Sequence, residues 1–201
     1  MNLKIIVVGG TGTLGSKISN ELGKRHEVIR AGSKSGDMQV DITSSESIRA
    51  MFKKAGAFDA LVSAAGSGHF GPFYSMTEED FYTGIRSKMM GQINLVMIGK
   101  EFVSDNGSFT LTSGILHNDP VAGGVGLSMV NGALNSFAMA AACELMRGIR
   151  LNVVSPGLVE DSARELGSYF PGHTPVAMQR MVNGYVKSVE GKLTGKVIEV
   201  I

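Results

Sequence analysis

Short apolar runs alternate with longer amphipathic stretches along the whole chain. The run at 3–8 is apolar except for Lys4, which predicts a strand, and Leu14, Ile18 and Leu22 then recur every four residues, as on one helix face. The pattern predicts further strands over residues 27–31, 38–42, 60–64, 108–112, 150–155 and 196–201. The longest helices are predicted over 85–102, 127–145 and 176–189. Such alternation predicts a parallel sheet covered on both faces by right-handed crossovers. We therefore expect one α/β domain over residues 1–201, a doubly wound sheet of about seven strands.

Polar residues mark where two of these helices begin. Thr43, with Glu46 three residues later, matches a capping box, and Thr77 followed by three acidic residues predicts an N-cap. The helices at 85–102 and 127–145 carry apolar residues on more than one face, so we expect both to be covered on two sides. The many methionines lie mostly at helix positions and are expected to fill the core.

A glycine-rich turn, Gly9-Gly10-Thr11-Gly12-Thr13-Leu14-Gly15, joins the first strand to the first helix. Strand, glycine turn and amphipathic helix form the first half of a nucleotide-binding βαβ unit, the start of a Rossmann-type fold. Glycine lets a pyrophosphate approach bare backbone, where the positive end of the helix dipole favours its charge. The spacing is G-x-x-G-x-x-G rather than G-x-G-x-x-G. We interpret the stretch as a phosphate-binding turn, with a purely structural turn as the alternative.

The end of the second strand indicates which nucleotide the fold would prefer. An acidic side chain there binds the free 2′-hydroxyl of NAD, whereas a basic one accommodates the 2′-phosphate of NADP. No acid occurs from Val28 to Gly36, and Ser33 and Lys34 supply a hydroxyl and a cation. This favours NADP over NAD, although a solvated turn could have the same composition.

Composition excludes several other classes of function. The 201 residues are 43% hydrophobic and carry a net charge of +1, which gives no electrostatic reason to expect nucleic acid or an anionic membrane as partner. No transmembrane run and no signal peptide are expected, so the predicted location is the cytoplasm. Cys143 is the one cysteine and is expected to be a small buried residue; no Cys/His cluster predicts a metal site.

Several segments in a fixed order resemble the short-chain dehydrogenase/reductase family over nearly the whole chain. They are the glycine turn, Asp41-Ile42, Ser63-Ala64-Ala65-Gly66, Thr112-Ser113 and Asn152-Val153-Val154-Ser155-Pro156-Gly157. The resemblance implies an oxidoreductase that transfers hydride between a nicotinamide cofactor and a small carbonyl or alcohol substrate. It also implies a homodimer or homotetramer, because the equivalent helices of the family pack against a twofold mate.

The resemblance assigns cofactor-binding positions along the chain. Gly9, Thr11, Gly12, Thr13, Leu14 and Gly15 would line the pyrophosphate, and Ser33 and Lys34 would meet the 2′-phosphate. Asp41 and Ile42 would flank the adenine, unless Asp41 is only the acid of a turn before a helix. Ala64, Ala65 and Gly66 would pass under the ribose, and Pro156, Gly157, Leu158 and Val159 would approach the nicotinamide.

The chain departs from the family at the proton donor. The family's catalytic serine fits Ser113, but its Tyr-x-x-x-Lys motif falls on Leu127 to Asn131, with no tyrosine between Tyr82 and Tyr169. Leu127 cannot deliver a proton, and losing a general acid costs roughly 10²–10⁴ in rate. The family's Asn position on the preceding helix is occupied by Lys88.

Three other side chains are candidates for the missing role. Lys88 could donate a proton if burial lowers its pKa, and His117 and His69 lie on loops that face the substrate in this family. Each could instead be an ordinary surface residue. Two hypotheses follow: an NADP-dependent oxidoreductase with Ser113, Lys88 and His117 as catalytic candidates, or a catalytically silent NADP(H)-binding protein that acts as a redox sensor or oligomeric partner.

Overall fold

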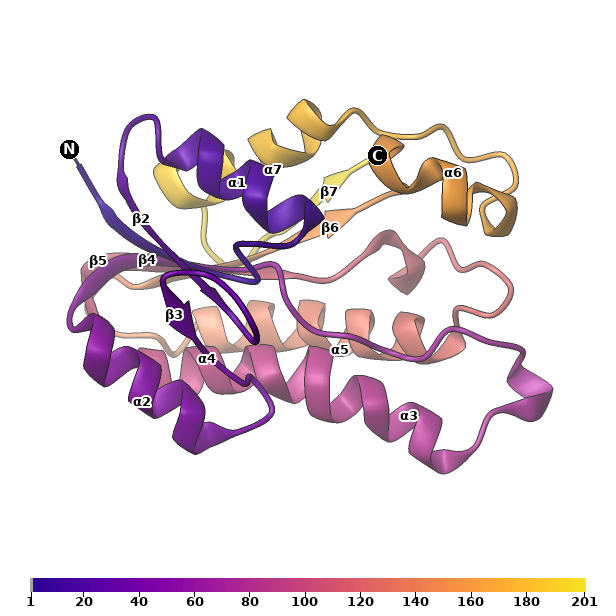
Figure 1. Ribbon diagram of the computed structural model, residues 1–201, viewed down its shortest axis with the longest axis horizontal. Coiled ribbons are helices and arrows are strands. Elements are labelled where there is room, and N and C mark those ends of the chain that lie inside the picture. Colours follow the sequence, from indigo (N-terminus) through magenta and orange to yellow (C-terminus); the bar gives the residue numbers. More distant parts are fainter. Residues whose placement is uncertain (1) are drawn as a thin grey trace.

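A seven-stranded sheet, with strand order β3-β2-β1-β4-β5-β6-β7, forms the centre of the molecule (Figure 1). The computed structural model describes residues 2–201. The strands are β1 (Lys4–Val8), β2 (Glu27–Gly32), β3 (Met38–Gln39), β4 (Phe58–Ser63), β5 (Val103–Thr112), β6 (Arg150–Pro156) and β7 (Val197–Val200). All neighbouring strands are parallel. The order reverses between β1 and β4, which is the switch point where such sheets bind ligands. The predicted doubly wound α/β fold is confirmed.

Helices cover both faces of this sheet (Figure 1). One face carries α1 (Thr13–Leu22) and α7 (Met178–Glu190); the other carries α2 (Ser45–Ala55), α4 (Gly91–Gly99) and α5 (Val125–Ala142). The short helices α3 (Glu78–Gly84) and α6 (Ala163–Leu166) flank the loops that follow β4 and β6. Because both faces are covered, β1 is apolar after Lys4: Ile5 and Val7 enter one core and Ile6 and Val8 the other.

The structure corrects two local predictions and confirms a third. Thr43 does not cap α2: Ser44 is the N-cap, its side chain accepting from the Ser47 N–H, while Thr43 bonds the Asp41 carboxylate. The strand predicted at 38–42 spans only Met38–Gln39. Asp41 already belongs to the turn before α2, where it accepts hydrogen bonds from Thr43. The N-cap at Thr77 is present as expected, in a reciprocal capping box with Asp80.

The predicted helix at 85–102 is not a single α-helix. Residues Ile85–Met90 form a π-helical segment, and the α-helix α4 follows it without a break. Segments with this wider hydrogen-bonding pattern occur most often at functional sites, where they displace one residue from the regular helical face. Lys88 lies within this segment.

Two predictions about burial were wrong. Cys143 is exposed at the end of α5, and four methionines lie at the surface rather than in the core: Met97, Met129, Met139 and Met146. Met97 lies on α4, and Met129 and Met139 lie on α5. These three methionines therefore form exposed apolar surface on the two helices. By length and composition α5 could also span a membrane, with mean hydropathy 1.2, but Val130, Leu134 and Ala138 pack it against the sheet.

Candidate active site

Three of the four glycines in the turn between β1 and α1 have distinct roles. Gly9 has φ +79°, and a Cβ there would lie 2.5 Å from the Ala64 carbonyl oxygen. A Cβ on Gly15 would overlap the Gly9 carbonyl. Gly12 has φ −74°, and an added Cβ would meet only the Gly9 carbonyl oxygen, at 3.4 Å. Gly9 and Gly15 are therefore required by the packing of the chain, whereas the space beside Gly12 is open to a ligand.

The amino end of α1 presents unpaired backbone donors beside Gly12. Gly12 is the N-cap and provides no side chain, and no acidic residue occupies the first turn. Within residues 2–201, no acceptor contacts the Thr13 or Leu14 N–H group. Free N–H groups and the positive end of a ten-residue helix make this a site for an anion. The turn therefore fits the pyrophosphate of a dinucleotide. No side chain at Gly12 would have to move to admit it.

The loop after β2 lies next to this turn. The Ser35 hydroxyl donates to Thr11 Oγ1 over 2.9 Å, which joins the two segments. Ser33 and Lys34 are exposed between them, and Lys34 forms no ion pair among the described residues. The nearest acid along the chain, Asp37, accepts a hydrogen bond of 2.8 Å from the Arg30 N–H and so is held against β2.

Asp41 is tied into its own turn. It accepts hydrogen bonds from the side chain of Thr43 at 2.7 Å and from its N–H at 2.9 Å, and these lower the pKa of its carboxyl. Ile42 is buried against Gly91 at the start of α4. The geometry thus gives Asp41 the role of a turn acid, and it places Ile42 in the floor between β3 and α4.

The end of β4 passes directly over the π-helical segment. Ala64 donates its N–H to the Val8 carbonyl, and Ala65 and Gly66 follow it. Gly66 has φ +113°, and a Cβ there would lie 2.6 Å from the Lys88 Cα. A side chain at this position would push the loop away, so glycine allows the loop and Lys88 to be in contact.

Lys88 reaches the end of β5 from the π-helical segment. Its ammonium donates a hydrogen bond of 2.9 Å to the Ser113 carbonyl. Burial lowers the pKa of Lys88 to about 8. The Lys88 ammonium therefore lies at the backbone of Ser113, the residue that fits the family's catalytic serine.

Gln92 fixes this arrangement and was missed by sequence reasoning. It is completely buried, and its amide nitrogen donates to the carbonyls of Lys88 and Thr112 at 3.0 and 2.8 Å, while its oxygen accepts from the Thr112 N–H at 2.9 Å. One side chain thus links the π-helical segment to β5. The signal in the sequence was an amide side chain within a mostly apolar helical stretch.

Several buried polar atoms at the site have no partner within residues 2–201. They include Ser113 Oγ and Asn131 Oδ1, both from residues that are only 2% exposed. The Asn131 amide nitrogen lies 2.8 Å from where a Cβ of Gly114 would be, so Asn131 faces the residue after Ser113. Leu127, at the family's tyrosine position, packs on Gly68. Buried polar groups normally find partners, so these atoms are positioned for water or a ligand.

The two histidine candidates are already engaged. His117 Nδ1 lies 3.0 Å from the Gly114 carbonyl and its Nε2 lies 3.6 Å from Glu199. His69 Nδ1 lies 3.3 Å from Asp80 at the start of α3. Both rings are held by neighbours of the Lys88 and Ser113 site, and neither contacts Lys88 or Ser113 Oγ. This makes Lys88 the stronger candidate for a proton donor.

The segment after β6 closes the far side of the site. Pro156 ends the strand, the Gly157 N–H donates to the Val200 carbonyl, and Leu158 is buried. Val159 pairs with Val176 in an isolated parallel bridge, which anchors the long loop containing α6. These four residues lie at the carboxyl end of β6, at the same edge of the sheet as the glycine turn.

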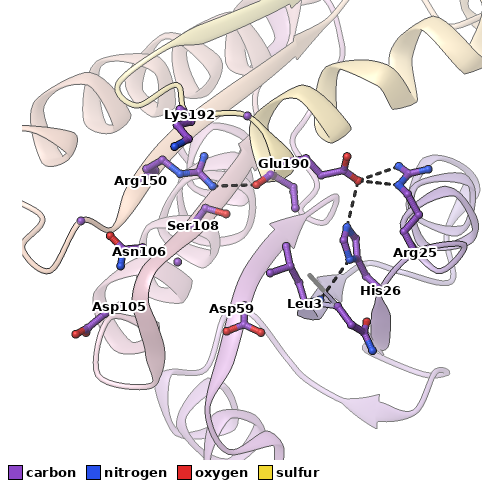
Figure 2. A pocket seen from close by; sticks show the side chains of 15 residues that line it. Leu3, Arg25, His26, Asp59, Asp105, Asn106, Ser108, Arg150, Glu190 and Lys192 are labelled. Atoms are coloured by element: carbon purple, nitrogen blue, oxygen red, sulfur yellow. Dashed lines mark hydrogen bonds and ion pairs between the residues drawn. The ribbon is translucent and has the colours of Figure 1, made fainter.

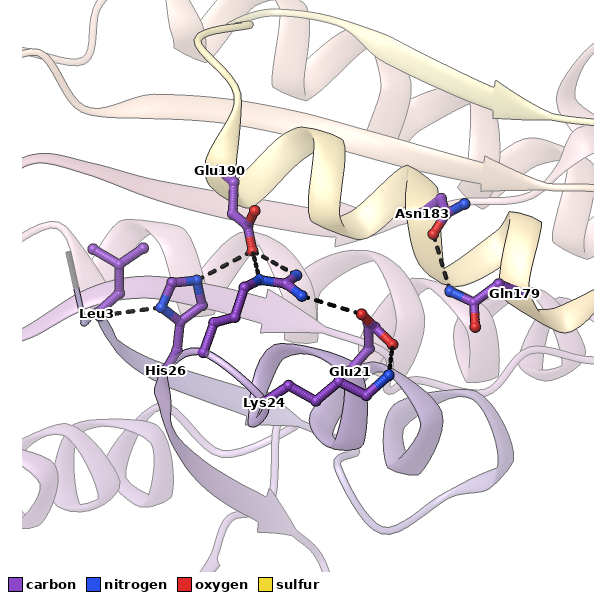
Figure 3. Close-up of polar contacts among 8 residues, drawn as sticks. Leu3, Glu21, Lys24, His26, Gln179, Asn183 and Glu190 are labelled. Atoms are coloured by element: carbon purple, nitrogen blue, oxygen red, sulfur yellow. Dashed lines mark hydrogen bonds and ion pairs between the residues drawn. The ribbon is translucent and has the colours of Figure 1, made fainter.

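A large groove of about 1260 Å³ lies at the opposite edge of the sheet, where the strands begin (Figure 2). Its charges already serve the fold. Arg150 donates to the carbonyls of Ser188 and Val189, and Glu190 binds Arg25 at 2.8 Å and His26 at 3.2 Å (Figure 3). This network joins the ends of α1 and α7. The groove is therefore distant from the residues described above, and its Arg25, His26, Arg150 and Glu190 side chains hold elements of the fold together.

Comparison with known proteins agrees with this architecture. A family model described as enoyl-(acyl carrier protein) reductase matches residues 10–184. The crystal structure of the protein lin1944 from Listeria innocua is 45% identical, with a TM-score of 0.97 over 99% of this chain and 100% of that one. No curated protein matches the chain.

Two further solved structures share the fold. A small-chain dehydrogenase in complex with NADPH is 25% identical, with a TM-score of 0.88 over 100% of this chain and 97% of that one. The ligand-free aldohexose dehydrogenase of Thermoplasma acidophilum is 18% identical, with a TM-score of 0.87 over 99% of this chain and 92% of that one. From the extent of the family match and the geometry of the site, the chain belongs to the short-chain dehydrogenase/reductase family.

Proposed function

We propose that the chain is an NADP-dependent oxidoreductase that interconverts a small carbonyl compound and its alcohol, with Lys88 in place of the family's tyrosine. The observation that carries the proposal is the contact between the Lys88 ammonium and Ser113, at the sheet edge where the glycine turn leaves room for a dinucleotide. A relative at 25% identity was crystallised with NADPH, which supports the choice of cofactor.

The residues of the chain would divide the work as follows. When bound, NADPH supplies a hydride. Lys88 holds a proton at Nζ close to neutral pH, because burial brings its pKa to about 8, and a general acid is most useful when its pKa is near the working pH. The buried Ser113 hydroxyl orients the substrate oxygen, and Gln92 keeps the Lys88 backbone in register with β5. Leu127 forms an apolar wall where the family has its acid.

The exposed Lys34 is proposed to bind the 2′-phosphate and so to select NADP over NAD. The side chain has no ionic partner among the described residues, and the nearby Asp37 is turned to the Arg30 N–H. A phosphate at this point would gain a cation and the Ser33 hydroxyl without meeting a free carboxylate.

One observation favours the second hypothesis, a cofactor-binding protein without turnover. Leu127 and Asn131 remove both members of the family's Tyr-x-x-x-Lys motif, while the glycine turn remains intact. Such a protein would bind NADP(H) and report the redox state to a partner. It would keep the affinity for NADPH and show no reduction of any carbonyl compound.

The experiment that separates the two hypotheses measures NADPH oxidation against a panel of aldehydes and ketones. The enzyme hypothesis predicts turnover by the wild type and its loss in Lys88→Met, with NADPH affinity kept within about threefold. Lys100→Met, a change of an exposed lysine beyond α4, serves as the matched control. Affinity for NADPH without turnover in the wild type would favour the silent protein.

We also propose that the exposed apolar faces of α4 and α5 pair with a second copy of the chain. Met97, Met129 and Met139 are 52%, 41% and 47% exposed on these helices, and a groove of about 470 Å³ separates the carboxyl end of α4 from that of α5. An apolar surface of this kind on two adjacent helices is typical of a subunit interface.

The cytoplasmic location stays a prediction.

A further inference from the structure

We infer that the substrate carries a carboxylate next to its reacting carbonyl, as in a 2-oxo acid, and that Lys88 and Ser113 together bind this group. The inference deepens the proposed function and rests on it. Lys88 lacks a counter-charge, and two of its hydrogen-bond donors have no acceptor among the described residues. An ammonium has three N–H donors, and in the structure one of them is used, by the Ser113 carbonyl.

No carboxylate among residues 2–201 lies within 4.0 Å of the Lys88 ammonium. The groups that contact Lys88 are uncharged: the Ser113 carbonyl at the ammonium, the amide of Gln92 at the Lys88 backbone carbonyl, and Gly66 beside the Lys88 Cα and Cβ. The lowered pKa of Lys88 has burial as its cause. A buried cation that lacks a counter-charge is costly, and an anionic ligand would relieve that cost.

Ser113 supplies a second unused donor at the same place. Its Oγ is buried without a partner among the described residues, on the residue whose carbonyl already accepts from Lys88. A buried hydroxyl on the residue whose carbonyl binds the ammonium adds a second donor for a carboxylate, and a neutral ketone would have no charge to offer the lysine.

The chemistry is consistent with the proposed reaction. In a 2-oxo acid the keto oxygen and one carboxylate oxygen are neighbours, so the two remaining N–H groups of Lys88 can contact both. The carbonyl carbon accepts a hydride from bound NADPH and the keto oxygen takes a proton from Lys88. The C=O π bond is lost, C–H and O–H bonds form, and the products are a 2-hydroxy acid and NADP⁺. Solvent then returns a proton to the lysine.

Other titratable groups near the site have partners of their own. His69 is paired with Asp80, and His117 with Glu199 and the Gly114 carbonyl. The test runs from pH 7 upward. Above that pH, deprotonation of Lys88 is the change expected to weaken the binding of an anion at this site.

The test uses the full chain saturated with NADPH and measures the affinity of oxamate, an unreactive 2-oxo acid analogue, by calorimetry. For a lysine with a pKa of about 8, binding to the protonated form should weaken about thirtyfold between pH 7 and pH 9.5. Lys100→Met should behave as the wild type. Lys88→Met should lose oxamate affinity by at least about tenfold at pH 7, and Lys88→Arg should keep that affinity with no pH dependence.

A second measurement compares pyruvate with butane-2,3-dione, which replaces the carboxylate by a neutral acetyl group of similar size. We expect kcat/KM to favour pyruvate by at least about tenfold in the wild type. Equal kcat/KM values for the two compounds would overturn the carboxylate site but not the proposed oxidoreductase activity. The same conclusion would follow if oxamate affinity changed neither with pH nor in Lys88→Met. Failure of NADPH to bind would instead remove the proposed function itself.

Discussion

The Lys88 ammonium donates a 2.9 Å hydrogen bond to the carbonyl of Ser113, from a π-helical segment that packs against the end of β5. The two residues are 25 positions apart and neither shows its role by itself. Their contact requires Gly66, which lets the loop after β4 lie on Lys88, and Gln92, which bonds the Lys88 carbonyl. The candidate catalytic group is thus held by the backbone of three elements.

The first prediction concerns how stability depends on pH. The folded pKa of Lys88 is about 8, below its ordinary value of 10.5, so the unfolded chain binds more protons between these values. The free energy of unfolding should therefore rise with pH across this window, by at most about 3 kcal/mol. Lys88→Met should lack this rise in chemical denaturation, whereas Lys100→Met should keep it. Parallel curves for the wild type and Lys88→Met would contradict the burial of a charged lysine.

The second prediction separates two glycines of the turn. A Cβ at Gly12 would contact only the Gly9 carbonyl oxygen, at 3.4 Å, so Gly12→Val should melt within a few degrees of the wild type and lose NADPH affinity by about a hundredfold or more. A valine at Gly15 would overlap the Gly9 carbonyl, so Gly15→Val should destabilise the fold by more than about 2 kcal/mol. If Gly12→Val still binds NADPH, the turn is structural only.

A third prediction tests the choice of nucleotide. Lys34→Ala should weaken NADPH binding by about tenfold and leave NADH binding unchanged, because only NADPH carries the 2′-phosphate. The NADPH affinity of the wild type should also fall more steeply with salt than that of the variant. Lys24→Ala, a lysine paired with Glu21 on the surface of α1, is the control. Equal affinity of the wild type for both nucleotides would refute the preference.

The fourth prediction restores the family's motif. Asn131 faces Gly114, next to the carbonyl that binds Lys88, so Leu127→Tyr with Asn131→Lys would bring a second ammonium beside the first. Like charges at this distance oppose each other, and the double variant should gain little activity. Adding Lys88→Asn, the family's residue at that position, should raise carbonyl reduction by tenfold or more above the double variant. The rate of NADPH oxidation gives the answer, and a double variant as active as the triple would show that the lysines do not interact.

The fifth prediction concerns assembly. Met97→Glu combined with Met139→Glu places charges on the exposed faces of α4 and α5 and should convert an oligomer into a monomer in light scattering. Tyr74→Glu is the control, because Tyr74 is fully exposed on the loop before α3. A wild-type monomer at micromolar concentration would exclude the interface.

Sequence periodicity was sufficient for the fold because each signal is local. A strand buried on both faces is apolar at successive positions, as in β1 from Ile5 to Val8, and a helix on a sheet must repeat its apolar residues every three or four positions. The glycine turn was visible for the same reason. The departure at Leu127 and Asn131 was also readable, since it depends only on which residues are present.

Burial and long-range contacts were decided by the tertiary structure. Sequence alone suggested Lys88 as a replacement donor but did not show its bond to the Ser113 carbonyl. Nor did it distinguish Gly12 from Gly9 and Gly15, which differ in backbone conformation and in the atoms around them. It also placed Cys143 and the methionines of α4 and α5 in the core, because an apolar residue on a long helix has the same pattern whether its face meets the sheet or the outside. The pKa of a lysine, the orphaned hydroxyl of Ser113 and the position of Gln92 all depend on groups brought together from distant parts of the chain, and local patterns carry no information about these.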